Sequence, residues 1–245
     1  MVPKVYLISG ANRGIGRALV TEYVSRDNTI VIGAVRDPSK DTSKSLLTLP
    51  TGENSRVILV KVDSLSTSDP SHAIKDVQEN SIDHIDVVIA NAGHCEFGPV
   101  VSRTAEDLQQ HFNVNTIGPM LLFQAAWPLL NKAKEPKFIV ISSTLGSLVE
   151  APKYGLPSAA YGASKAALNY LTKIINIEHT NLIAMPICPG WTQTDMGATG
   201  ARAAGLEAPP VPLEISIKGV VTEIDHAVRT EQSRFASHEH IDREW

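Results

Sequence analysis

A glycine-rich segment near the start of the chain constrains the fold most strongly. Gly10, Gly14 and Gly16 follow the apolar run Val5–Ser9 and accompany the start of a helical pattern over Ile15–Ser25. Glycines at such a junction let the backbone turn tightly and approach another group closely. A tight turn from a buried strand into a helix is typical of a β-α-β unit.

Short apolar runs alternate with helical patterns along the rest of the chain, which indicates a parallel sheet. The runs are almost wholly apolar, as strands covered on both faces require. We therefore predict one α/β domain over residues 1–245, a three-layer, doubly wound parallel sheet with a Rossmann fold. Further strands are predicted over Thr29–Val35, Arg56–Val62, Ile85–Ala90, Phe138–Ser142 and Leu182–Cys188, and helices over Asp69–Asn80, Thr104–Asn131 and Ala159–Glu178.

Three segments depart from this alternation: Asp37–Ser55, Leu145–Ser158 and Gly197–Pro212. Long irregular segments in compact domains often serve as lids or binding loops. We expect the last two to wall a substrate pocket, with a lid around residues 195–213. Pro119 and Pro128 fall inside a predicted helix, where each removes a backbone donor, so we expect a kink or a break there.

Composition and charge exclude several classes of partner. The 245 residues carry a net charge of −4, whereas nucleic acid or an anionic membrane requires a basic face. Apolar runs are shorter than a membrane span, and the N-terminus lacks a signal-peptide layout. Two cysteines, Cys95 and Cys188, are too few for a disulfide framework or a zinc site, and we expect a cytoplasmic protein.

The position of the glycine-rich turn predicts a dinucleotide site. A helix N-terminus offers free N–H groups and a partial positive charge to a pyrophosphate. The spacing here is Gly-x-x-x-Gly-x-Gly, which differs from the Gly-x-Gly-x-x-Gly of many dinucleotide folds. A plain strand-to-helix turn is the alternative interpretation.

Residues at the end of the second predicted strand favour NADP(H). An acidic side chain there would bind a ribose 2′-hydroxyl and repel a 2′-phosphate. Arg36 occupies about that position, and Arg13 in the glycine-rich turn is a second cation that can pair with a phosphate. Asp37 is the competing residue, and we prefer for it the role of turn starter before Pro38.

Two further strand ends are candidates for cofactor contact. Asp63 could accept a hydrogen bond from an adenine amino group or could instead cap the following turn. The small residues of Asn91–Gly93 would let a cofactor lie close to the backbone.

A tyrosine and a lysine four residues apart, Tyr161 and Lys165, predict acid–base chemistry. Residues four apart share a helix face, so the ammonium could lower the pKa of the phenol. Ser143 could hold a substrate oxygen beside the tyrosine, and Asn115 could hold the water or backbone link of a proton path. Each residue alone is more often packing, solvated surface or turn, and the combination carries the hypothesis.

These motifs together resemble the short-chain dehydrogenase/reductase family, from Lys4 to about Phe235. The resemblance implies a catalytic tetrad of Asn115, Ser143, Tyr161 and Lys165. It also implies cofactor contacts from the following residues: Gly10, Asn12, Arg13, Gly14, Ile15, Gly16, Arg36, Asp63, Asn91, Ala92, Gly93, Tyr161, Lys165, Pro189, Gly190, Thr192 and Thr194.

A narrower resemblance is to the carbonyl-reductase-like branch, which includes fungal ketoreductases. It rests on Pro189–Gly197 and the closing Trp245, and it implies NADPH-dependent reduction of a ketone or aldehyde. The segment 237–244 departs from the expected pattern because it lacks an Asp-Gly turn. The family resemblance also implies a homodimer or homotetramer built on the long helices.

Two alternative functions remain open: an NADP(H)-binding sensor with little turnover, and an NAD-linked alcohol dehydrogenase. His238, His240 and Asp242 could be taken for metal ligands, but their spacing is loose and we prefer a solvated tail, with no metal site. Cys95 could line the pocket, but we prefer the interpretation of an inert buried thiol.

Overall fold

The computed structural model describes residues 2–245, apart from the side chain of Ala203. The chain forms two compact units. The first comprises residues up to Ala92 together with Gly118–Ile139, and the second comprises Gly93–Ile117 and Val140–Trp245. The strand order β3-β2-β1-β4-β5-β6-β7 confirms the predicted doubly wound α/β class.

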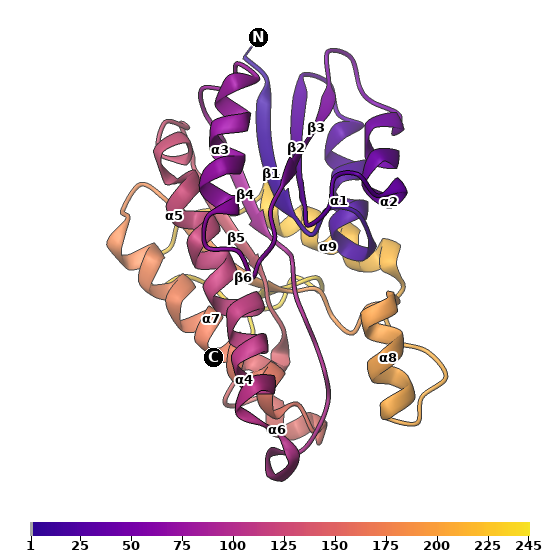
Figure 1. The fold of residues 1–245 in the computed structure, drawn as a ribbon. Helices are drawn as coiled ribbons and strands as arrows, with labels where there is room; N and C mark the ends of the chain where they lie inside the picture. The colour runs from indigo at the N-terminus through magenta and orange to yellow at the C-terminus, as the bar shows by residue number, and fades with distance from the viewer. Residues whose placement is uncertain (1) are drawn as a thin grey trace. The chain divides into compact units, whose positions relative to one another are not determined.

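The first unit begins with alternating strands and helices. Its strands β1 (Lys4–Ser9), β2 (Thr29–Val35), β3 (Arg56–Lys61) and β4 (Val87–Ala90) pair in parallel, with β1 between β2 and β4. Helices α1 (Gly14–Val24), α3 (Asp69–Glu79) and α5 (Gly118–Leu130) are its longest. Figure 1 shows α3 and α5 side by side. The short helices α2 (Asp41–Lys44) and η1 (Ser45–Thr48) interrupt the predicted irregular segment after β2.

Buried apolar strands form the core of this unit, as the sequence predicts. All seven residues of β2 are buried, because both faces of the strand are covered. Tyr6 and Tyr23 stack at 4.0 Å between ring centres and join β1 to α1.

The second unit carries the later elements. β5 (Lys137–Ile141) enters it, followed by β6 (Ile183–Cys188) and β7 (Ala236–Ser237), which pair in parallel. Helices α4 (Ala105–Phe112) and α7 (Ala159–Glu178) lie side by side (Figure 1). The remaining elements are η2 (Val100–Ser102), the π turn η3 (Asn113–Ile117), η4 (Thr144–Gly146), α6 (Ala151–Tyr154), α8 (Asp195–Ala203) and α9 (Leu213–Asp225).

The long helix predicted over residues 104–131 is interrupted by a π turn rather than at either of its prolines. The π turn η3 separates α4 from α5, and Pro119 follows it as the second residue of α5. Pro128 lies inside α5, which continues to Leu130. Within residues 2–245, no helix has both the length and the apolar composition needed to cross a membrane.

Candidate active site

The glycine-rich turn of the first unit has a geometry that only glycine accommodates. Gly10 and Gly14 have φ values of 64° and 53°, in the left-handed region that disfavours side chains. A Cβ on Gly16 would collide with the Gly10 carbonyl oxygen and with the Asn91 side chain. The turn therefore lies pressed against the residues that follow β4.

The N-terminus of α1 is suited to an anion. Arg13 precedes the helix and gives it no side-chain cap, and the described first turn holds no acidic residue. The first helical N–H groups thus have no side-chain oxygen from that position to satisfy them. Asn12 donates to the Thr42 hydroxyl at 3.1 Å, and Ile15 is half-buried.

Asn91 braces this turn. Its amide nitrogen donates to the carbonyl oxygens of Ser9 at 2.9 Å and Gly10 at 3.3 Å. The Ser9 hydroxyl accepts from the backbone N–H groups of Asn91 and Ala92, both at 3.0 Å. We did not predict Ser9 from the sequence, although a hydroxyl on the last residue of a strand before the turn is the signal.

Arg36 and Asp37 follow β2 with different surroundings. Arg36 is exposed at the strand end. The Asp37 carboxylate accepts from the Ser39 hydroxyl at 2.6 Å and the Ser39 N–H at 2.9 Å, and these bonds lower its pKa. Asp37 is therefore ionised and held in its own turn, which is the role we preferred for it.

Asp63 has the capping role that the sequence left open. Its carboxylate accepts from the Leu65 N–H at 3.0 Å in the turn after β3. The alternative, an adenine contact, stays a prediction.

Asn115 organises the second unit from the π turn. Its side chain is fully buried, and its oxygen accepts from the His94 N–H at 2.8 Å. Its amide nitrogen donates to the His94 carbonyl at 2.8 Å and to the Ser164 hydroxyl at 2.9 Å. Short π segments often occur at functional sites, and here the widened turn carries the buried amide.

Ser164 continues this network toward Tyr161. The Ser164 hydroxyl donates to the Tyr161 carbonyl at 2.7 Å, and the Thr116 hydroxyl donates to the Ser164 carbonyl at 2.8 Å. Helix α7 is thus bonded to the π turn at Ser164 by the side chains of Asn115 and Thr116. We predicted neither His94 nor Ser164 from the sequence.

His111 supports the loop that carries His94. Its ring is fully buried, and Nε2 accepts from the Glu96 N–H at 3.0 Å. The rings of His94 and His111 lie 4.5 Å apart. Burial lowers the pKa of His94, and the neighbouring His111 lowers it further. The folded loop therefore favours the neutral form of the His94 ring.

Tyr161, Lys165 and Ser143 come together at the start of α7. The Lys165 ammonium donates to the Ile141 carbonyl at 2.7 Å and lies 5.8 Å from the centre of the Tyr161 ring. Lys165 is 4% exposed, and burial lowers its pKa to about 8. Burial raises the pKa of Tyr161, while a hydrogen bond with the Ser143 hydroxyl opposes that rise.

The direction of the Tyr161 shift corrects one sequence expectation. We expected the ammonium to lower the pKa of the phenol, but the pKa lies above its ordinary value. The physical reason is desolvation, because a buried phenolate loses its hydration. Tyr161 is therefore a neutral phenol in this structure.

Ser143 sits on a closely packed turn. It precedes η4, and its hydroxyl accepts from the Leu145 N–H at 3.1 Å. A Cβ on Gly146 would lie 2.7 Å from the Lys165 Cβ, and one on Gly162 would lie 2.7 Å from the Leu145 carbonyl oxygen. The segment after Ser143 therefore lies directly on α7.

The segment from Pro189 to Thr194 is tied to its own unit. Gly190 has φ 77°, and the His238 ring packs against it. Thr192 is buried, with its hydroxyl near the carbonyls of Pro189 (3.0 Å) and Gly190 (3.2 Å). Thr194 begins α8, because its hydroxyl accepts from the Gly197 N–H at 3.1 Å. Both threonines thus have structural roles, and their cofactor contacts stay predictions.

The two cysteines are free thiols. Burial raises the pKa of Cys95 to about 12 and also raises that of Cys188. Thiols with raised pKa values are poor nucleophiles near neutrality. This agrees with the interpretation of Cys95 as an inert thiol.

The C-terminal segment is more firmly attached than the solvated tail that we predicted. His240 lies 2.8 Å from a Glu223 carboxylate oxygen, and Asp242 accepts from Arg234 at 2.7 Å. His238 packs against Gly190 rather than toward these residues. Among the described residues, no cluster of His, Cys, Asp and Glu has the arrangement of a metal site.

Comparison with known proteins places this geometry in a family. Residues 4–204 match the family model for short chain dehydrogenase. Norsolorinic acid ketoreductase nor1 of Dothistroma septosporum is 38% identical, over 96% of this chain and 89% of its own. Short chain dehydrogenase gsfK of Penicillium aethiopicum is 37% identical over the full length of both chains.

A solved structure shares the whole fold. The NADPH-bound carbonyl reductase from chicken fatty liver is 26% identical, with a TM-score of 0.87 and full coverage of both chains. These similarities cover both the glycine-rich turn and the tyrosine–lysine pair. The chain therefore belongs to the short-chain dehydrogenase family and is an oxidoreductase.

Proposed function

We propose that this protein reduces a ketone or aldehyde to an alcohol with NADPH, and that Tyr161 is the general acid. The observation that carries the proposal is a half-buried neutral phenol grouped with a serine hydroxyl and a buried ammonium. The similarity to a norsolorinic acid ketoreductase and to a carbonyl reductase supports a carbonyl substrate.

The residues of the first unit fit a dinucleotide. Its glycine-rich turn excludes side chains, and α1 presents N–H groups without a side-chain cap at Arg13 in the described structure. When bound, the reduced nicotinamide supplies the hydride. We propose that the cofactor is held by Gly10, Asn12, Arg13, Gly14, Ile15, Gly16, Arg36, Asp63, Asn91, Ala92, Gly93, Tyr161, Lys165, Pro189, Gly190, Thr192 and Thr194.

The chain's own groups manage the substrate oxygen and its proton. Ser143 donates a hydrogen bond that orients the carbonyl beside Tyr161. As negative charge grows on that oxygen, the Tyr161 O–H bond breaks and its proton forms the alcohol O–H. The Lys165 ammonium stabilises the phenolate that remains until solvent returns a proton, and Asn115 positions α7 for these steps.

We infer a preference for NADPH over NADH from the two arginines. Arg36 is exposed where β2 ends, and the nearby carboxylate of Asp37 is engaged by Ser39. Asp37 therefore leaves Arg36 able to face a 2′-phosphate, and we propose Arg13 as the second cation for that phosphate. The solved carbonyl reductase is an NADPH complex, which is consistent with this preference.

We also propose that the protein associates through its long helices, as a homodimer or a homotetramer. Leu108 on α4 and Tyr170 and Ile177 on α7 are exposed although they are large and apolar. Light scattering coupled to size exclusion would test this proposal, and a monomeric mass would contradict it.

The test of the function is loss of nicotinamide absorbance against a panel of ketones and aldehydes, with NADPH and NADH side by side. We expect turnover with NADPH and little with NADH. The second candidate function is an NADP(H) sensor. Tight NADPH binding, measured by cofactor fluorescence, with no turnover across the panel would favour the sensor.

A further inference from the structure

We propose that Arg243 and Glu150 are positioning residues that set substrate affinity by fixing the loop after Ser143. The C-terminal segment here means residues 238–245, and the Glu150 loop means residues 147–154. The proposal rests on the proposed function, because it assigns that loop to the substrate side of the reacting groups.

Glu150 is an acid buried within the second unit. It is only 8% exposed, and its backbone N–H donates to the Ser147 hydroxyl at 2.9 Å. One carboxylate oxygen accepts from the Glu244 N–H at 3.1 Å, and the other lies 3.5 Å from the Arg243 guanidinium. These two partners of the carboxylate both come from the C-terminal segment, and Glu244 lies 94 residues later in the chain than Glu150.

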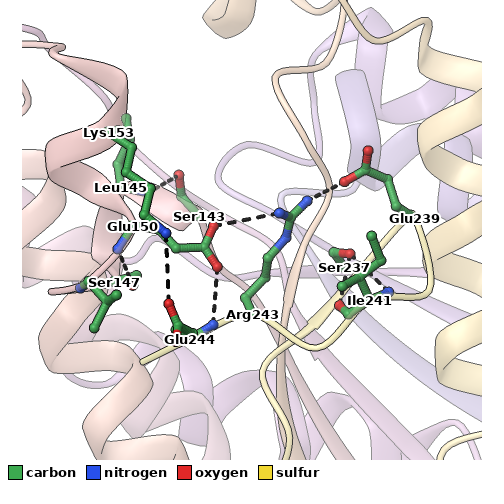
Figure 2. Close-up of polar contacts among 11 residues, drawn as sticks. Ser143, Leu145, Ser147, Glu150, Lys153, Ser237, Glu239, Ile241, Arg243 and Glu244 are labelled. Carbon is green, nitrogen blue, oxygen red and sulfur yellow. Dashed lines mark hydrogen bonds and ion pairs between the residues drawn. The ribbon is translucent and has the colours of Figure 1, made fainter.

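Arg243 lies between two acids. Figure 2 shows its guanidinium between the carboxylates of Glu150 and Glu239. Its side chain is 20% exposed, and its Nε is buried with no hydrogen-bond partner among the described residues. A largely buried charge is costly unless it is paired, so the position of the guanidinium is strongly coupled to Glu150.

The end of the C-terminal segment is anchored to the body of the second unit. The Arg243 N–H donates to the Phe235 carbonyl at 2.7 Å. The Trp245 ring packs 5.8 Å from that of Phe235, and the Lys173 ammonium of α7 lies 4.4 Å from the Trp245 ring centre. These contacts give Arg243 a fixed base from which to hold Glu150.

The Glu150 loop connects this anchor to the reacting groups. It begins directly after Gly146, whose backbone packs against Lys165. Its apolar side chains are turned outward, with Leu148 82% and Tyr154 47% exposed. The loop thus presents apolar surface while Glu150 ties it down, and a large apolar carbonyl compound is the substrate class that such a surface favours.

Removing the guanidinium should therefore loosen the loop and leave the cofactor residues unchanged. We expect Arg243→Met to raise KM for an apolar ketone by about tenfold, the usual scale for one lost charge-assisted contact. The change in kcat should be smaller, and the Kd for NADPH should not move. Arg243→Lys keeps the charge and should recover part of the loss.

The matched control is Arg234→Met. Arg234 also pairs with acids of the C-terminal region, at 3.4 Å from Glu223 and 2.7 Å from Asp242, but its described contacts do not reach the Glu150 loop. The Arg234→Met variant should have a KM close to that of the unsubstituted protein. Glu150→Gln provides a second variant, because it removes the charge while its amide oxygen can still accept from Glu244.

Limited trypsin digestion gives a readout that does not depend on turnover. Lys153 lies in the loop and is exposed, and its side chain is 3.7 Å from the Glu244 carboxylate. We expect faster cleavage after Lys153 in Arg243→Met and in Glu150→Gln than in Arg234→Met, at a temperature well below the Tm of all three variants.

The two assays distinguish a failure of the proposed function from a failure of the role proposed for Arg243. Faster cleavage at Lys153 with no turnover by the unsubstituted protein would refute the proposed function and confirm the anchoring. Turnover with unchanged KM, or equal cleavage rates in Arg243→Met and Arg234→Met, would overturn the role of Arg243.

Discussion

At the scale of the residue, burial shifts the pKa values of the two central groups in opposite directions. The pKa of Tyr161 is raised and the pKa of Lys165 is lowered to about 8, because the protein interior disfavours both the phenolate and the ammonium. Tyr161 thus keeps its proton over the physiological pH range, whereas Lys165 loses its charge just above that range. The pH dependence should therefore follow Lys165.

The first prediction is a fall in kcat/KM for carbonyl reduction above pH about 8. The ammonium of Lys165 is present below its lowered pKa and is lost as the pH rises through that value. Lys165→Arg should remove this fall in whatever activity remains, because a guanidinium stays charged. A profile that is flat to pH 10 in the unsubstituted protein would contradict the assignment.

The second prediction concerns Arg36. Arg36→Ala should weaken NADPH binding by about tenfold or more, which corresponds to a lost charge-assisted hydrogen bond to a phosphate. NADH lacks the 2′-phosphate, so its Kd should change little. Fluorescence titration of both cofactors checks this, and equal losses for NADPH and NADH would rule out Arg36 as the selecting residue.

At the scale of the element, two turns of the candidate site are each held in place by one asparagine side chain. The βα turn depends on Asn91, which donates to two carbonyl oxygens. The π turn depends on Asn115, which satisfies both backbone groups of His94. Each amide joins segments that are distant in sequence. Replacing either asparagine should therefore disturb the distant segment as well as the turn itself.

Asn91→Asp tests the first of these turns. The carboxylate would face two carbonyl oxygens, so we expect a loss of about 2 kcal/mol in the free energy of unfolding and weaker NADPH binding. Asn80→Asp is the control, because the Asn80 amide donates to Asp76 at an exposed helix end. Equal losses in urea denaturation of the two variants would deny Asn91 its bracing role.

Asn115→Ala tests the second turn. It would leave the two backbone groups of His94 without the Asn115 side chain as their partner, at a cost of about 1–3 kcal/mol for each buried group left unsatisfied. It would also remove the hydrogen bond that the Ser164 hydroxyl accepts. We expect a lower Tm and a lower kcat together, since Ser164 leads to Tyr161. A drop in kcat with an unchanged Tm would instead indicate that Asn115 acts directly in proton transfer.

How far the sequence predicts an element depends on how local its causes are. Ala159–Glu178 is observed at its predicted bounds, because a long periodic pattern fixes a helix locally. The helix α9 escaped prediction, since β-branched residues such as Ile215 and Val220, together with Gly219, lower its helix propensity. Gly219 is explained only by tertiary structure, because the His238 backbone packs where a Cβ would lie.

At the scale of the whole molecule, the fold class and the family could be predicted from motifs that lie along the entire chain. The contacts of the C-terminal segment do not, because Arg243 and Glu150 are distant in sequence and no motif marks the pair. The expected lowering of the Tyr161 pKa was also wrong, because the desolvation that raises it depends on the folded structure and not on the local sequence.

Cofactor binding should stabilise the whole molecule. At 100 times its Kd, a ligand adds about 2.7 kcal/mol to the free energy of unfolding. For a chain of this size we expect NADPH to raise Tm by about 5–10 °C. NADH at the same concentration should raise it less, and thermal denaturation with each cofactor would show the difference.

The most direct test of the central claim is the turnover of Tyr161→Phe against that of the unsubstituted protein, with NADPH and one ketone from the panel. We expect kcat to fall by a factor of about 10² to 10⁴, the usual contribution of a general acid. The Kd for NADPH should stay within a few-fold of its original value. Undiminished turnover in Tyr161→Phe would show that another group supplies the proton and would contradict the account.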